Sequence, residues 1–202
     1  MKKLIATLST ILIATSLFAV VATGPQFSLN AQVDGILFHG FTTEQYTSSD
    51  ELLAAQSNIG QKATVDKLDL TSDAAQDIGF YNFYSTNLEQ TSISFRMESL
   101  SAKVLNEKYY VPYTLNYTSI NDNKKIVLND GTIEGKKVAT QTEPDSITEA
   151  VLKTTESSTG LRYGILDLSV EFEGTQNVSF GLPQVDGDNY YTGTITAFID
   201  AQ

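Results

Sequence analysis

The sequence predicts an all-β fold, an antiparallel β-sandwich with one or two short helices in its loops. Many short segments alternate apolar and polar residues with a period of two, which is the pattern of a half-buried strand. Clusters of Gly, Asn, Asp and Ser lie between these segments and supply turns. About eight to ten short strands with so few helical segments favour a sandwich over an evenly spaced up-and-down barrel.

The first 22 residues have the pattern of a bacterial secretory signal peptide. Lys2 and Lys3 precede an apolar run that extends to Ala22 and that only Ser and Thr interrupt. A membrane anchor is the alternative. We expect a signal peptide over residues 1–22 and a single sandwich domain over residues 23–202. The protein is then exported to the periplasm, the cell surface or the medium, and no further apolar run predicts a membrane span after cleavage.

The composition is acidic and lacks cysteine. The formal net charge is −11, and it becomes −13 when Lys2 and Lys3 leave with the signal peptide. Such a chain is poorly suited to nucleic acid or anionic lipid, whose phosphates need cations. The absence of cysteine excludes disulfides, thiol catalysis and thiolate metal sites, so burial and hydrogen bonds alone must hold the fold together.

Regular amphipathic strands are predicted at both ends of this domain. The last segment, residues 190–202, follows a turn at residues 186–189 and carries apolar residues on one face and threonines on the other. Residues 26–33 alternate in the same way. The apolar rows are Tyr191, Ile195, Ala197 and Ile199 in the last strand, and Phe27, Leu29, Ala31 and Val33 in the first. Because burying such side chains is favourable, each row needs a sheet to cover it.

The residues between these ends predict further strands and one helix. The predicted strands are residues 63–70, 77–84, 91–98, 109–118, 125–128, 161–172 and 178–182. Gly40 is expected to break the apolar stretch at residues 36–38, and Pro112 to mark a sheet edge. A capping box at Ser48–Glu51 predicts a short helix. Residues 132–140 are expected to form a hairpin with 125–128, and residues 143–158 a loop or a short helix around 147–152.

Two of these strands make the sharpest predictions about the core. In residues 91–98 and 161–172 the apolar residues alternate strictly with Ser, Asp, Arg and Glu. The side chains expected to face inward are Ile93, Phe95, Met97, Leu166, Leu168, Val170 and Phe172.

No arrangement of side chains predicts catalysis or a metal site. His39 is the only histidine, and no nucleophile elbow accompanies it, so we expect a partly buried structural histidine. The acidic residues Asp122, Asp186 and Asp188 lack the ligand spacing of a calcium loop and are interpreted as turn residues. We therefore expect no enzymatic activity and no cofactor.

A carbohydrate site is the remaining chemical alternative. Glu171 and Glu173 are spaced for the outward face of a strand rather than for a glycosidase pair. Ten Tyr and ten Phe offer rings that can stack on sugars, but the chain has no Trp, and packing in the core accounts for most of these rings.

Two segments resemble the fimbrial subunits of the chaperone–usher type, and a third resembles related exported proteins. Residues 187–199 (GDNYYTGTITAFI) resemble their closing strand, in which a Gly-x-Tyr-x-Gly element leads into alternating Thr and apolar residues. Residues 27–35 are similar to the N-terminal strand of the disulfide-free fimbrial class, with Gly35 where the family has proline. Residues 78–81, followed by the Ser85–Asn87 turn, are similar to a strand of related exported bacterial sandwich proteins.

This resemblance implies an immunoglobulin-like sandwich with a structural or adhesive role in a pilus or at the cell surface. It implies that Phe27, Leu29, Ala31 and Val33 leave their own domain and complete a neighbouring subunit, and that a periplasmic chaperone fills the gap before assembly. The alternative is a self-contained extracellular domain that binds carbohydrate or another ligand. We expect the first strand to lie beside the last one. Gly35 bends more freely than proline and favours pairing within the same domain, but the choice between own and neighbouring subunit stays open.

Overall fold

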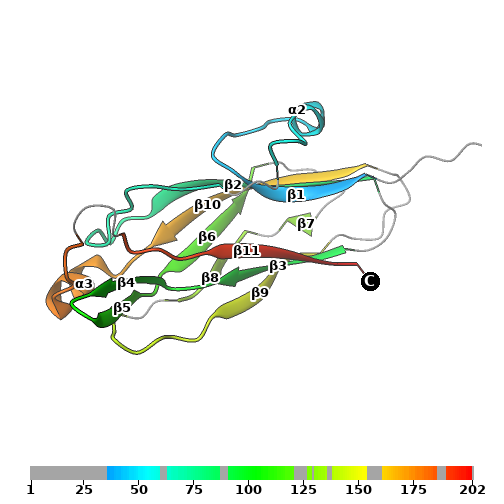
Figure 1. The fold of residues 1–202 in the computed structure, drawn as a ribbon. Coiled ribbons are helices and arrows are strands. Elements are labelled where there is room, and N and C mark those ends of the chain that lie inside the picture. The colour runs from blue at the N-terminus through cyan, green and yellow to red at the C-terminus, as the bar shows by residue number, and fades with distance from the viewer. Residues whose placement is uncertain are drawn as a thin grey trace, which may run out of the picture. The chain divides into compact units, whose positions relative to one another are not determined.

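Antiparallel β-strands build the part of the chain that the computed structural model describes (Figure 1). That part comprises residues 36–59, 63–86, 91–120, 127–128, 130–135, 138–153, 161–185 and 190–201. All of it belongs to one compact unit, residues 35–202. The predicted signal peptide, the predicted first strand with Phe27, Leu29, Ala31 and Val33, and the turn predicted at residues 186–189 lie outside the described residues.

The strands form two main sheets and a small hairpin. The five-stranded sheet has the order β1 (Leu37–Thr42), β2 (Gln76–Ser85), β10 (Arg162–Glu171), β6 (Thr114–Ser119) and β8 (Gly131–Ile133). The four-stranded sheet has the order β11 (Ile195–Ala201), β3 (Thr91–Met97), β9 (Ile147–Lys153) and β7 (Val127–Leu128). The hairpin pairs β4 (Leu100–Val104) with β5 (Glu107–Val111). The predicted all-β antiparallel sandwich is confirmed.

The core lies between the two main sheets. All seven side chains that the sequence places inward on β3 and on β10 with the residue after it are buried. Phe95 packs at the centre, with its ring centroid 4.9 Å from that of Tyr81 and 5.6 Å from that of Phe41. Alternation along a single strand therefore predicts which face is buried, because successive side chains point to opposite faces and the apolar ones face the core.

A second apolar cluster covers the outer face of the five-stranded sheet. The predicted helix is confirmed as α2 (Ser49–Ala54), and the Ser48 side chain accepts a hydrogen bond from the backbone N–H of Glu51 at 3.2 Å. Leu52 of this helix is fully buried beside Tyr84 and Ile165. The second half of β2, residues 81–85, is therefore buried on both faces, whereas residues 76–80 are partly exposed.

Two predicted strand boundaries are wrong. Gly40 does not break the first described strand, because β1 continues to Thr42 with Gly40 opposite Asn82 in an unbroken ladder. Residues 109–118 are not one strand. β5 ends at Val111 and β6 begins at Thr114, and Pro112, which has no N–H to donate, lies where the chain passes from the hairpin to the five-stranded sheet.

Three predicted conformations are also wrong. Residues 147–153 form β9, an inner strand, although Glu, Ala, Leu and Lys favour a helix when no neighbour decides the matter. The strand expected at 178–182 is replaced by a second helix, α3 (Gly174–Phe180), which ends at Gly181 in the left-handed conformation. Residues 63–70 form no strand.

The hairpin predicted between residues 125–128 and 132–140 does not form. β7 pairs with β9 in the four-stranded sheet, whereas β8 pairs with β6 in the other sheet. The two short strands thus belong to opposite layers of the sandwich, and sequence proximity did not decide their pairing.

Candidate functional site

The candidate site begins at the last strand, β11, which lies at the edge of its sheet (Figure 1). Among the described residues it pairs only with β3. The backbone N–H of Glu98 donates to the carbonyl of Thr194 at 3.0 Å, so even-numbered residues of β11 form the hydrogen-bonded pairs with β3. The N–H and C=O groups of Ile195, Ala197 and Ile199 consequently point away from β3, toward the open edge.

The side chains of the same three residues point toward the core. Ile195, Ala197 and Ile199 are half-buried and pack against the main cluster, together with Tyr191. This is the apolar face that the sequence predicts for the strand. On the opposite face Phe198 is 44% exposed. The edge of β11 therefore combines unpaired backbone groups with an apolar face that is only partly covered.

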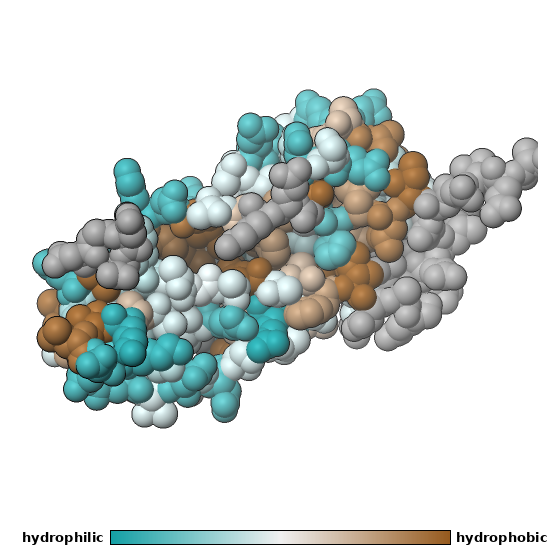
Figure 2. All heavy atoms as spheres, viewed as in Figure 1, coloured by the Kyte–Doolittle hydropathy of each residue, from teal (hydrophilic) through white to brown (hydrophobic). Residues whose placement is uncertain are grey.

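A groove of about 680 Å³ lies beside the start of β11, and Ile195 is the residue of this strand that lines it. Its buried lining residues are mainly apolar and come from the five-stranded sheet and the residues that adjoin its strands: Tyr113, Leu168, Val170 and Phe172. Its more exposed lining comes from two segments, residues 63–68 and residues 190–193. Figure 2 shows hydrophobic atoms in a hollow between hydrophilic ones on this face.

The chain that leads into β11 is fixed in place by hydrogen bonds. Thr192 exchanges two backbone hydrogen bonds with Ser101, at 2.8 and 3.0 Å. The Tyr191 hydroxyl donates to the carbonyl of Pro183 at 3.0 Å, and burial of this group raises the pKa of Tyr191 to about 12. Tyr191 is therefore a neutral donor at physiological pH, and the end of the groove that it lines carries no charge from it.

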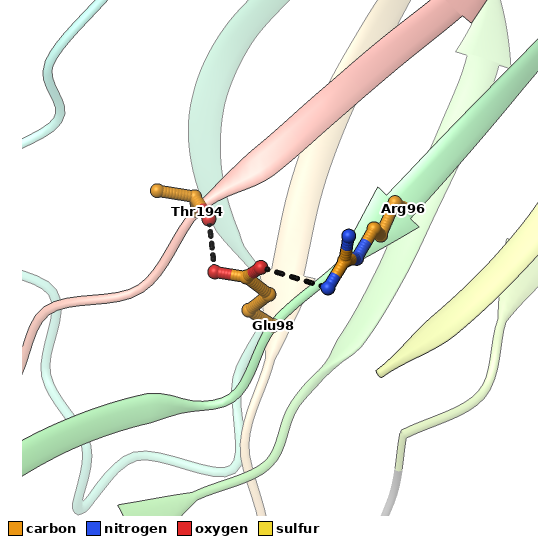
Figure 3. A network of polar contacts seen from close by, with 3 residues as sticks. All are labelled: Arg96, Glu98 and Thr194. Carbon is orange, nitrogen blue, oxygen red and sulfur yellow. Dashed lines mark hydrogen bonds and ion pairs between the residues drawn. The ribbon is translucent and has the colours of Figure 1, made fainter. Parts of the chain in front are cut away.

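Glu98 fixes the start of β11 from the neighbouring strand (Figure 3). Its carboxylate accepts a hydrogen bond from the Thr194 hydroxyl at 2.5 Å and lies 3.3 Å from the Arg96 guanidinium. Both charged side chains are nearly half exposed, so the ion pair contributes little to stability. The hydrogen bond from Thr194, by contrast, joins the two segments and supports their register by keeping Thr194 opposite Glu98.

The described side chains considered for catalysis lie on or beside different elements. His39 is half-buried, and its Nδ1 lies 2.9 Å from the hydroxyl of buried Tyr81. Glu171 ends β10, and Glu173 precedes α3. In the part of the chain that the structure describes, no three His, Asp or Glu side chains gather closely enough to hold a metal ion. Asp122, Asp186 and Asp188 lie outside that part.

Sequence reasoning identifies one side of this site and misses the other. The inward row of β11 is predicted residue by residue. The position of residues 63–68 beside the groove is not, because it depends on contacts between segments far apart in the chain. Phe27, Leu29, Ala31 and Val33, which the resemblance assigns to strand donation, lie outside the described residues.

No protein family, curated protein or solved structure matches the chain. Neither of the helices in the described ranges is long and apolar enough to cross a membrane.

Proposed function

We propose that this chain is a non-enzymatic, exported structural or adhesive subunit of a surface assembly, similar to a fimbrial subunit, and that subunits join by adding an extended strand beside β11. The observation that carries this proposal is the open edge of β11, whose first residue, Ile195, also lines a mainly apolar groove.

The open edge matches the backbone of an added β-strand, and the groove matches its apolar side chains. A strand added along β11 accepts hydrogen bonds from, and donates them to, the outward backbone groups of Ile195, Ala197 and Ile199. Every second side chain of that strand then points toward the partly covered core, and those beside Ile195 reach the groove. Full burial of each large apolar side chain is worth roughly 1.5–3 kcal/mol, so three or four of them supply a strong driving force.

The chain carries a segment of the required kind. Residues 26–33 alternate apolar and polar side chains, and the apolar row is Phe27, Leu29, Ala31 and Val33. An open strand edge beside exposed apolar surface favours uncontrolled association, so the edge needs a defined partner. The proposed partner is the first strand of a second copy. A periplasmic chaperone is the proposed partner of the subunit before assembly.

A pair of charge substitutions in the full chain tests this function. Leu29→Asp introduces a charge on the apolar row, and Asn30→Asp introduces the same charge on the polar face of the same segment. The unmodified chain and Asn30→Asp are expected to form oligomers whose mass rises with concentration in light scattering. Leu29→Asp is expected to remain monomeric, because a buried unpaired carboxylate is strongly unfavourable.

Light scattering of the unmodified chain also distinguishes pairing of the first strand within its own domain from pairing with a neighbouring subunit. If it stays strictly monomeric at high concentration, exchange between subunits does not occur and the proposal of an assembly is wrong. Equal association of both variants would show that residues 26–33 do not join the subunits.

A further inference from the structure

A cluster of exposed aromatic and polar side chains lies where α3 meets the β4–β5 hairpin. Its aromatic members are Tyr109 of β5 and Phe180 of α3, whose rings meet edge to face with their centroids 6.3 Å apart. Phe180 is 41% exposed, and Tyr109 is partly exposed. Figure 2 shows hydrophobic atoms among hydrophilic ones at this end of the molecule, where α3 lies in Figure 1. Two rings thus present apolar surface to solvent.

A carboxylate lies beside these rings in a fixed orientation. Glu107 precedes Tyr109 by two residues and lies on the same face of β5. Its Oε2 accepts one hydrogen bond from the Tyr109 hydroxyl at 2.7 Å and another from the Gln141 side-chain amide at 3.0 Å. Its Oε1 has no hydrogen-bond partner among the described residues. The carboxylate is therefore oriented by two donors and keeps one oxygen free for a ligand.

The two donors are polar groups in a defined state. The hydrogen bond to Glu107 raises the pKa of Tyr109 above its ordinary value of 10.0, so this hydroxyl stays protonated at physiological pH. The carbonyl oxygen of the Gln141 side chain has no partner within the described ranges. The polar side of the cluster therefore offers a carboxylate oxygen and an amide next to each other.

Backbone and side-chain contacts hold the three segments of the cluster together. Thr140, which precedes Gln141, exchanges two backbone hydrogen bonds with Tyr110 of β5, at 2.8 and 3.0 Å. The side chain of buried Asn177 in α3 accepts a hydrogen bond from the backbone N–H of Ala139 at 3.2 Å. The cluster is thus arranged before any ligand arrives, which lowers the cost of ordering it on binding.

We propose that this cluster, Glu107, Tyr109, Gln141 and Phe180, is a binding site for a neutral saccharide. A sugar ring has a face of C–H groups that stacks on exposed aromatic rings. It also has a rim of hydroxyl groups that donate to carboxylates and exchange hydrogen bonds with amides. The inference goes beyond the proposed function, because the cluster shares no residue with the outward edge of β11.

Charge and polarity decide the class of ligand. An apolar protein surface laid over the rings would bury the carboxylate of Glu107 without a donor for its free oxygen, which is unfavourable. A phosphate or an anionic sugar would be repelled by Glu107 and by a chain whose net charge is −11. A neutral ligand that carries hydroxyl groups beside a C–H face avoids both costs.

Saturation-transfer NMR of the full chain tests binding directly. The probes are neutral oligosaccharides that between them contain glucose, galactose, mannose and N-acetylglucosamine, and the anionic probe is an oligogalacturonate. We expect at least one neutral probe to receive saturation, mainly at the C–H protons of one ring face. If no neutral probe receives saturation, the inference is overturned. Stronger saturation of the oligogalacturonate than of every neutral probe would overturn the assignment to neutral sugars.

A matched pair of ring variants tests whether the sugar binds at this cluster. Phe180→Ala removes a ring of the cluster, whereas Phe198→Ala removes a ring of similar exposure, 44%, from β11. We expect Phe180→Ala to weaken binding of the neutral probe about fivefold, because stacking on one ring is lost, and Phe198→Ala to leave it unchanged. Full affinity of Phe180→Ala, or an equal loss in both variants, contradicts the proposed site.

A second matched pair tests the carboxylate. Glu143 accepts a hydrogen bond from the hydroxyl of Tyr110 at 3.1 Å, but the ring of that tyrosine is buried. We expect Glu107→Gln to weaken binding about tenfold, because hydrogen bonds to a charged acceptor are lost, and Glu143→Gln to leave it unchanged. Unchanged affinity of both variants overturns the role of Glu107. Light scattering of the same samples reports assembly separately, so failure of sugar binding and failure of strand addition are distinguished.

Discussion

His39 is the only histidine of the sequence, and its half-buried ring contacts the core residue Tyr81. Its ring lies at the edge of the Tyr81 ring, with centroids 5.9 Å apart, and its Nδ1 meets the Tyr81 hydroxyl. Burial lowers the pKa of His39 below its ordinary value of 6.5, because the charged imidazolium loses its hydration. The folded state therefore prefers neutral His39.

This preference predicts how stability depends on pH. Between the lowered pKa of the folded state and 6.5, the unfolded chain binds a proton that the folded chain does not. The contribution of His39 is fully present above pH 6.5 and is lost progressively as the pH falls below it. Urea titrations of the chain and of His39→Gln should show a fall in unfolding free energy below pH 6.5 in the chain alone. Parallel curves for both proteins would contradict the assignment.

Two carboxylates with lowered pKa values, those of Asp69 and Asp73, respond to acid at lower pH. Hydrogen bonds from Thr71 lower the pKa of Asp69, and those from Thr175 lower the pKa of Asp73, both from an ordinary value of 3.8. Their stabilising effect is lost only as the pH falls below that value. In the pH range just below 6.5, where His39 affects stability, these two carboxylates therefore do not contribute to the pH dependence.

At the scale of elements, a bulge in β2 occurs at Ile78, which lines the groove. Leu168 of β10 lies opposite Gly79, but the next residue, Ser169, lies opposite Asp77, so Ile78 is the extra residue. The bulge turns the Ile78 side chain into the main core. Gly79 adopts a φ of 110°, and an added Cβ would overlap the carbonyl oxygen of Thr42.

Two glycine-to-alanine substitutions at positions with positive φ distinguish the cost of the backbone conformation from the cost of steric overlap. Gly181 has a φ of 72°, and no atom lies within 4 Å of the place that a Cβ would occupy, so Gly181→Ala should cost about 1 kcal/mol. Gly79→Ala adds the overlap with Thr42, and we expect a loss of at least about 2 kcal/mol. Denaturant midpoints of the two variants measure the difference. Equal losses would mean that the chain relaxes around residue 79 at no cost.

The elements also show what the sequence predicts and what it does not. β3 and β10 are predicted correctly because their alternation reports burial on one face. β9 is missed because its residues favour a helix and its conformation is imposed by the strands on either side. β4 and β5 are joined by Leu105 and Asn106, with φ of 51° and 68°, a two-residue hairpin turn that lacks the usual glycine.

For the candidate site, the sequence predicts which side chains need burial but not where they meet. The inward row of β11 follows from alternation alone. The groove depends on the chain passing at Pro112 from the hairpin to the five-stranded sheet, and on residues 63–68 lying beside it. Neither follows from a local pattern. The residue types at positions 63–70 favour a strand. The structure has no strand there because no described segment pairs with these residues.

At the scale of the whole molecule, the central claim is that the outward edge of β11 accepts a strand. Ala197 is the residue at which this claim can be tested without removing a hydrogen bond from the existing sheet. Its N–H points away from β3, so proline there removes no hydrogen bond from the existing sheet, and edge strands tolerate proline on their open side. The same substitution removes a donor that an added strand needs.

The most direct test is the binding of the peptide of residues 26–34 to the full chain carrying Leu29→Asp, with and without Ala197→Pro. Thermal unfolding serves as the control that both proteins are folded, and it should give similar midpoints. We predict that the peptide binds the chain with Ala197 and that Ala197→Pro weakens binding about fivefold or more. Undiminished binding to a folded Ala197→Pro variant would contradict the account, because the added strand would then not pair with β11.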